Sequence, residues 1–163
     1  MSYREFCKAV KKKEAAAVVR ILREHPELHP IEERDGSLLG ILYRDAPELL
    51  ETAFRAGLHP DSANVLTIPF VCHLAAEGDV EVARLALRYG ADVERRNDEG
   101  ESALGYAVSW GNKAIVELLI EAGADVNGLE VAPDGIATPP LNACSDPEIE
   151  ALMLAHGARR SNE

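Results

Sequence analysis

Apolar residues recur at helical spacing in a series of short stretches along this chain of 163 residues. The clearest stretch covers residues 112–122, and its apolar positions fall on one face of a helix: Ile115, Val116, Leu118, Leu119 and Ala122. A shorter stretch over residues 102–110 precedes it, and Gly111 interrupts the pattern between the two. The pattern therefore predicts two short helices joined at a glycine, with Ser102 as the N-cap of the first.

The same pattern returns with a period of 33 residues. Gly57, Gly90 and Gly123 stand 33 residues apart, and each follows an apolar stretch. Around the last two glycines the sequence itself nearly repeats, over residues 78–93 and 111–127. We expect each of the three glycines to end a helix in the left-handed conformation. A period of this length indicates stacked helical units rather than one closed core.

Moving the pattern along the chain predicts a helix pair in each unit. The predicted pairs outside the clearest unit are Tyr3–Lys12 with Glu14–Glu24, Ser37–Arg44 with Pro47–Ala56, and Pro69–Glu77 with Val80–Tyr89. In the last unit we expect a long loop over Leu129–Ala137, a truncated first helix, and a second helix over Pro147–His156. The tail Arg159–Glu163 is expected to be frayed.

The near-repeat around Gly90 and Gly123, with its two Gly-Ala-Asp-Val turns, resembles the ankyrin repeat. The resemblance implies an all-α ankyrin-repeat solenoid of about five helix-turn-helix units with short finger turns. The units would form one domain over residues 1–158, followed by the tail 159–163, with these bounds: 1–34, 35–63, 64–96, 97–128 and 129–158.

The Thr-Pro-Leu-His opening of the family is intact in none of these units. Its histidine typically tethers neighbouring turns in ankyrin repeats, and the register puts other residues there: Cys7, Leu39, Cys72, Gly105 and Asn142. Gly105 within a helix costs about 1 kcal/mol relative to alanine. We therefore expect weaker coupling between repeats than in idealised members of the family.

Composition narrows the class of protein further. Apolar residues make up 47% of the chain but aromatic residues only 5%, so the core must consist of small and aliphatic side chains. No apolar run approaches the length of about 20 residues that a membrane span needs, and the start of the chain has no apolar signal segment. We expect a cytoplasmic protein. Its three cysteines, Cys7, Cys72 and Cys144, are expected to be reduced and to pack as small apolar residues.

The net charge of −11 is unevenly distributed. It is +2 over residues 1–34, −6 over residues 35–100 and −7 over residues 101–163. An acidic surface repels phosphate backbones, which argues against nucleic acid and favours a partner with a basic face. Ordinary solubility explains the charge equally well.

We find no catalytic, metal-binding or cofactor-binding pattern in the sequence. Asp92 and Asp125 lie in the two Gly-Ala-Asp-Val turns, where a carboxylate is expected to accept backbone N–H groups. The five histidines are not spaced as metal ligands, and the glycines form neither a phosphate loop nor a dinucleotide fingerprint. The prediction is a non-enzyme without cofactor or metal.

The resemblance implies a binding surface made of the first helices and the finger turns. The predicted contacts near the ends of the first helices are Lys12, Tyr43, Arg44, Glu77, Ser109 and Trp110. The predicted contacts in the fingers are Leu66, Ile68, Arg96, Asp98, Glu99 and Glu101.

Two apolar features of this surface allow two interpretations each. Trp110, the only tryptophan, is either an interface hot spot or a lid that folds over Tyr106 or Val71 and seals the core. The apolar finger Val65–Phe70 is either exposed as an interface or turned inward.

The leading functional prediction is a non-catalytic module that binds a protein partner through its concave face. Its acidic charge makes a small inhibitor attractive, such as an immunity or antitoxin-type protein that masks a basic active site. Two alternatives stay open: a small-ligand or enzymatic role in the groove or the Leu129–Ala137 loop, and a self-associating structural element that uses the apolar finger or an incompletely capped C-terminal face. The chain is expected to be a monomer unless bound.

Overall fold

A computed structural model describes residues 3–30, 32–33, 36–65, 68–131 and 137–161. The chain divides into two compact units, which we describe separately. The N-terminal unit consists of Met1–Phe70 with Tyr89–Ala91, and the C-terminal unit of Val71–Arg88 with Asp92–Glu163.

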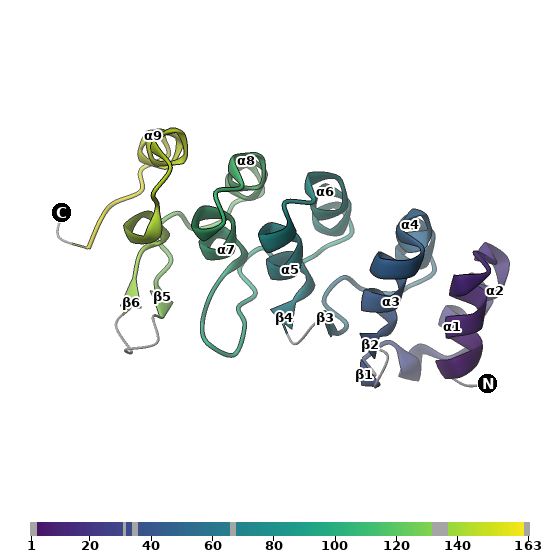
Figure 1. Ribbon diagram of the computed structural model, residues 1–163. Helices are drawn as coiled ribbons and strands as arrows, with labels where there is room; N and C mark the ends of the chain where they lie inside the picture. The colour runs from purple at the N-terminus through teal and green to yellow at the C-terminus, as the bar shows by residue number, and fades with distance from the viewer. Residues whose placement is uncertain (1–2, 31, 34–35, 66–67, 132–136, 162–163) are drawn as a thin grey trace. The chain divides into compact units, whose positions relative to one another are not determined.

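The N-terminal unit contains two helix pairs (Figure 1). The first pair is α1 (Tyr3–Lys11) with α2 (Ala15–Glu24), and the second is α3 (Leu38–Asp45) with α4 (Leu50–Arg55). Short 3-10 helices η1 and η2 cover Pro26–Leu28 and Pro47–Leu49. Two antiparallel two-residue ladders join β1 (Glu32–Glu33) to β2 (Gly36–Ser37), and β3 (Asn64–Val65) to β4 (Ile68–Pro69).

The C-terminal unit contains three further pairs (Figure 1). They are α5 (Phe70–Glu77, in this unit from Val71) with α6 (Val80–Arg88), α7 (Ala103–Ser109) with α8 (Lys113–Glu121), and η3 (Pro140–Ala143) with α9 (Pro147–Ala155). The strands β5 (Glu130–Val131) and β6 (Ala137–Thr138) form an antiparallel ladder before η3.

Local sequence signals set the ends of these helices. Ser102 caps α7 as predicted, because its side chain accepts a hydrogen bond from the backbone N–H of Gly105 at 3.1 Å. The three periodic glycines have φ between +91° and +110°, which confirms the left-handed helix ends. Lys13 stands where the third and fourth repeats have Gly78 and Gly111 between their helices, and it too is left-handed, with φ +56°.

Small and aliphatic side chains form the core, as the composition predicts. In α7 and α8 the buried positions are Ala103, Leu104, Ala107, Val108, Ile115, Val116, Leu118 and Leu119. Because small residues let helices approach closely, a core of this kind needs few aromatic side chains. Every helix in the described part of the chain falls short of the length and apolar content that a membrane crossing requires.

The second repeat differs from its prediction in two ways. The expected helix Pro47–Ala56 is a 3-10 turn followed by α4, since the proline begins a tight turn instead of an α-helical one. Ser37 caps α3 through Gly40 N–H, as Ser102 caps α7 through Gly105 N–H, so the caps lie 65 residues apart and not 66. Gly40, rather than Leu39, therefore corresponds to Gly105.

The apolar finger is turned inward where the structure describes it. Val65 and Phe70 are buried and Ile68 is half-buried, so the exposed interpretation is wrong for the first two. The reason is a hydrogen bond of 2.8 Å from Ser37 Oγ to the Asn64 carbonyl, which holds β3 against the start of α3. Leu66 lies outside the described residues.

The last repeat is more ordered than expected. The ends of the predicted Leu129–Ala137 loop pair as β5 and β6. The tail, expected to be frayed from Arg159, makes hydrogen bonds as far as Ser161. Arg159 N–H donates to Asn127 at 2.8 Å, Arg160 donates to Glu150 at 2.7 Å, and Ser161 N–H donates to Asn142 at 3.2 Å.

Candidate functional site

The predicted contact residues fall into one group in each unit. In the N-terminal unit Lys12 is exposed and lies 3.8 Å from Glu14. Tyr43 is half-buried, and its ring packs edge-on against Phe70 with 5.5 Å between centroids. Arg44 is exposed and donates to the carboxylate of the adjacent Asp45 at 2.9 and 3.2 Å.

Trp110 dominates the group in the C-terminal unit, because 66% of it is exposed. It follows the last residue of α7, and its backbone N–H donates to the backbone carbonyl of Tyr106 at 3.0 Å. The core-facing side of α7 is already filled by Ala107 and Val108. The interpretation of Trp110 as a lid over the core is therefore wrong, and the indole is available at the surface.

Asn112 joins the break after α7 to the end of α5. Its side-chain amide donates to the carbonyls of Ala75 and Ala76 at 2.7 and 3.1 Å. Trp110 lies two residues before this asparagine and exposed Glu77 one residue after the bonded carbonyls, so both flank one junction. The sequence prediction missed Asn112, although an asparagine directly after a helix-breaking glycine is a usable signal.

The finger before α7 is built around Asn97. Its side-chain oxygen accepts the N–H groups of Glu99 and Glu101 at 3.0 and 2.8 Å, and its amide donates to the Tyr106 hydroxyl and to Glu101, both at 3.0 Å. Burial, and then the hydrogen bond to Glu101, raise the pKa of Tyr106 to about 12. This network turns Glu101 inward and leaves Asp98 and Glu99 exposed at the tip of the finger.

Arg96, a predicted contact residue, is engaged within the C-terminal unit. One guanidinium nitrogen donates to the carbonyls of Gly100 and Leu129 at 2.8 and 2.9 Å and lies 3.4 Å from Glu130. Only 29% of its side chain is exposed. Arg96 therefore ties its own finger to the start of the next loop.

Glu130 provides a link that the sequence did not reveal. Its carboxylate accepts the Ser102 N–H at 2.7 Å and the Ser102 hydroxyl at 2.6 Å. A Cβ on Gly105 would lie 2.8 Å from this carboxylate. Gly105, where the resemblance implies a histidine, thus makes room for a glutamate from the following repeat. The link is charge-assisted, so the missing histidine does not leave these neighbouring turns untethered.

The remaining candidate chemistry has structural roles. Asp92 and Asp125 each accept a backbone N–H two residues on, from Glu94 and Asn127, at 2.9 Å, which confirms the prediction for both turns. Among the residues that the structure describes, His, Cys, Asp and Glu form no cluster able to hold a metal ion. The three cysteines all lie among the described residues and form no disulfide, and burial raises the pKa of Cys72 to about 12.

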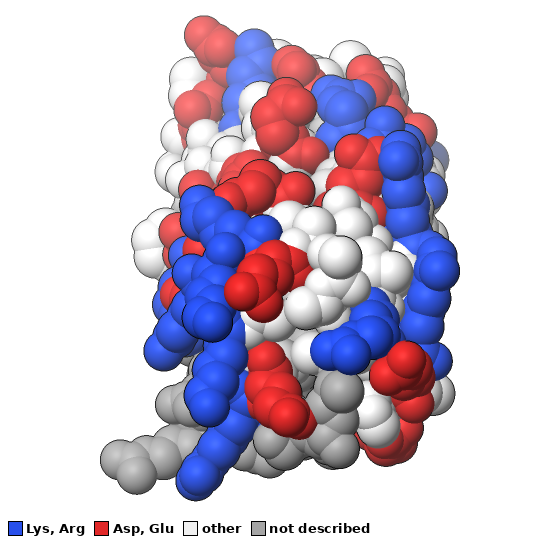
Figure 2. All heavy atoms as spheres, turned by 90° about the vertical axis from the view of Figure 1, so that its right-hand side faces the viewer, with Lys and Arg blue, Asp and Glu red and all other residues white. Residues whose placement is uncertain are grey.

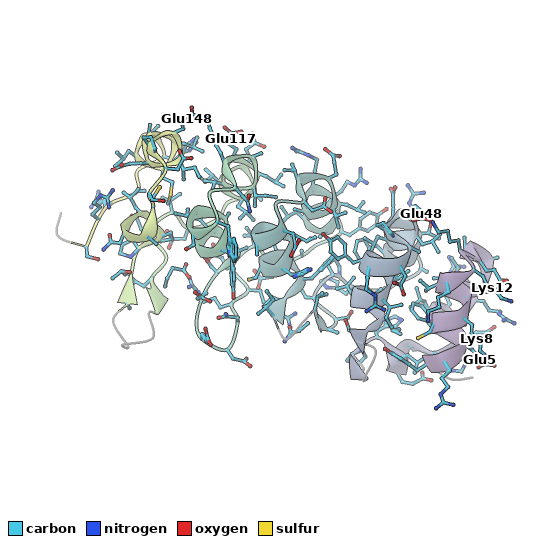
Figure 3. All side chains as sticks on the ribbon, in the orientation of Figure 1. Glu5, Lys8, Lys12, Glu48, Glu117 and Glu148 are labelled. Carbon is cyan, nitrogen blue, oxygen red and sulfur yellow. The ribbon has the colours of Figure 1, made fainter. Side chains whose placement is uncertain are left out.

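A depression of about 220 Å³ lies on the face formed by α1 and α2. Charged side chains surround it, including Glu5, Lys8, Lys12 and Arg20 (Figure 3). Lys and Arg line two edges of this end of the N-terminal unit, with Asp, Glu and uncharged residues between them (Figure 2). Sites for small molecules are usually larger and mainly apolar, about 300–1,000 Å³, so this depression resembles a solvated end of a repeat stack.

Comparison with known proteins establishes the class. A family model described as ankyrin repeats, in three copies, matches residues 43–129. The chain belongs to the ankyrin-repeat family, and the all-α ankyrin-repeat solenoid predicted from the sequence is confirmed. The repeats of this family typically serve as non-enzymatic interaction modules.

The chain is similar to parts of several larger proteins. The chain is 36% identical over 87 residues to the RelA-associated inhibitor of Mus musculus, covering 52% of the chain and 10% of that protein. It is 32% identical over 117 residues to the ankyrin repeat and KH domain-containing protein CBG24701 of Caenorhabditis briggsae, covering 68% of the chain and 4% of that protein. The chain thus spans a tenth or less of these relatives.

A solved structure shares the fold over nearly the whole chain. The ankyrin repeat domain of Bcl-3, described as a unique member of the IkappaB protein family, superposes with a TM-score of 0.77 at 22% identity. The match covers 95% of the chain and 72% of that domain.

Proposed function

We propose that this chain is a non-catalytic module that binds another protein through the ends of its first helices and its finger turns. The observation that carries the proposal is the exposure of Trp110 beside a fully packed α7. Tryptophan is usually largely buried in folded soluble proteins, and it is enriched at the centres of protein interfaces. The family to which the chain belongs supports the same role.

The partner in this proposal has a basic surface. The N-terminal unit has ten Lys and Arg against eleven Asp and Glu, a net charge of −1, whereas the C-terminal unit has seven against seventeen, a net charge of −10. The negative electrostatic field of the C-terminal unit would speed the approach of a basic partner and orient it. A small inhibitor that masks a basic site fits this charge, and one relative is named an inhibitor. The proposal includes a cytoplasmic location and a monomeric unbound state.

Quantitative affinity capture with matched variants tests the proposal. Trp110→Ala is compared with Leu154→Ala, because Leu154 on α9 is also a large apolar residue in the C-terminal unit and is 47% exposed. The genuine partner should be lost with Trp110→Ala and retained with Leu154→Ala. For a hot spot the purified pair should lose about 2 kcal/mol or more of binding free energy, roughly 30-fold in Kd.

Two control measurements distinguish a loss of binding from a loss of folding and test the basic partner. The melting temperature of Trp110→Ala should stay close to that of the original chain, because an exposed side chain contributes little to packing. A large drop would instead show that Trp110 supports the fold. Equal capture by both variants would refute the proposed surface, and an association rate that is insensitive to salt would refute the basic partner.

A further inference from the structure

The exposed indole of Trp110 offers a specific kind of contact. The face of an indole ring is electronegative and attracts a Lys or Arg cation placed over it, more often Arg. Since α7 ends at Ser109 and Gly111 turns the chain away at φ +71°, the indole stands at the end of the helix.

One exposed carboxylate flanks the same junction as Trp110. Glu77 is exposed across the junction that Asn112 makes with the end of α5. The finger before α7 contributes further acidic groups to the unit, and Asn97 at its base donates a hydrogen bond to Tyr106 of α7. That finger exposes Asp98 and Glu99 at its tip.

Two basic residues of the same unit are paired with carboxylates. Lys113, three residues after Trp110, is 2.8 Å from Glu148 of α9. Arg96, at the start of the finger, is held by Glu130 and two carbonyls. Trp110 and Glu77 therefore expose an aromatic ring and a carboxylate at one junction, within a unit whose net charge is −10.

We propose that the end of α7 is a receptor for an arginine side chain on an exposed linear segment of the partner protein. The inference rests on the proposed function and adds the chemistry of the partner at the same surface. A guanidinium fits better than an ammonium, because its plane stacks on the indole while its edge donates hydrogen bonds to carboxylates. Glu77 is the acceptor within the unit.

Selection from a displayed library of random linear peptides tests this inference without knowledge of the natural partner. Selected peptides are synthesised, labelled and titrated against the folded chain and its variants. The variants at the receptor are Trp110→Ala, Trp110→Phe and Glu77→Gln. The matched controls are Leu154→Ala and Glu117→Gln, because Glu117 is an exposed acid on the second helix of the same repeat as Trp110 (Figure 3).

The inference expects selected peptides to share an arginine whose replacement by glutamine weakens binding about as much as Trp110→Ala does, roughly 30-fold. Trp110→Phe should retain part of the affinity, since phenylalanine is a weaker cation receptor. Glu77→Gln should cost about threefold, an effect that salt reduces, while both controls should change nothing.

Three results would overturn the inference. They are peptides without a required basic residue, peptides that bind Trp110→Ala at full affinity, and failure to select any peptide above background. A dimer in sedimentation that Trp110→Ala dissolves would assign the surface to a second copy and also overturn it. The affinity capture with Trp110→Ala and Leu154→Ala tests the proposed function separately from the peptide selection. If the captured partner is a folded protein that requires Trp110 but no arginine, the proposed function stands and the arginine inference fails.

Discussion

Replacing Gly105 by alanine should destabilise the chain, although helix propensity predicts the opposite. Alanine in the middle of α7 is favoured over glycine by about 1 kcal/mol. Its Cβ would lie 2.8 Å from Glu130 Cδ and Oε2, closer than Cβ atoms come to such groups in folded proteins, so the glutamate side chain must shift. We expect this shift to break the two hydrogen bonds that the glutamate accepts from Ser102 at 2.7 and 2.6 Å.

The magnitude follows from these two bonds. Hydrogen bonds to a charged group contribute about 1.5–3 kcal/mol each. We take the lower value, because 14% of the Glu130 side chain is exposed and water replaces part of the loss. Two bonds at about 1.5 kcal/mol outweigh the gain of about 1 kcal/mol, so Gly105→Ala should lower the free energy of unfolding by about 2 kcal/mol.

A change of sign in a second background tests the reasoning. In Glu130→Ala the obstacle is gone, so adding Gly105→Ala should now raise the free energy of unfolding by about 1 kcal/mol. Gly40 is the matched control, because it also lies three residues after a capping serine, but a Cβ there would be no closer than 3.4 Å to another atom. Gly40→Ala should therefore be stabilising by a similar amount.

Urea titrations followed by circular dichroism measure all four variants, with slopes compared to detect any loss of cooperative unfolding. If Gly105→Ala stabilises the original chain, or if its effect is the same with and without Glu130, the proposed link between the glycine and the glutamate is wrong. A destabilising Gly40→Ala would show that the cap, and not Glu130, demands glycine.

Three further predictions concern other parts of the fold. Asn112→Ala should lower the free energy of unfolding by about 1–2 kcal/mol in urea titrations, because two carbonyls at the end of α5 lose their donor; no change would discount that junction. Burial lowers the pKa of His73, so the histidine binds its proton more readily in the unfolded chain than in the folded one. The free energy of unfolding should therefore fall as pH drops below about 6.5, and His73→Gln should flatten this dependence in urea titrations repeated across the acid range. At pH 8 a thiol-reactive disulfide should modify half-exposed Cys7 before buried Cys72, whose pKa is about 12, and the reverse order would contradict the burial.

Local patterns in the sequence were enough to predict the repeated helices. Capping by Ser102, the left-handed glycines and the acceptor roles of Asp92 and Asp125 depend on residues within a few positions, so a single stretch of sequence carries the whole signal. The same reasoning gave a register for the second repeat that was one residue out at its first helix. A strict period of 33 residues aligns Leu39 with Gly105, whereas the capping serine Ser37, also a local signal, aligns Gly40 with Gly105.

The side-chain geometry of the candidate surface depended on residues distant in sequence. Glu130 binds Ser102 across 28 residues, and Asn112 binds the end of α5 across 36 and 37 residues. Local hydrophobic periodicity determines which face of a helix is buried, so it predicted the stack and its class. The exposure of Trp110, the hydrogen bonds of Arg96 and the burial of Val65 depend on which residues, distant in sequence, pack against each side chain. Only the tertiary structure determines those contacts.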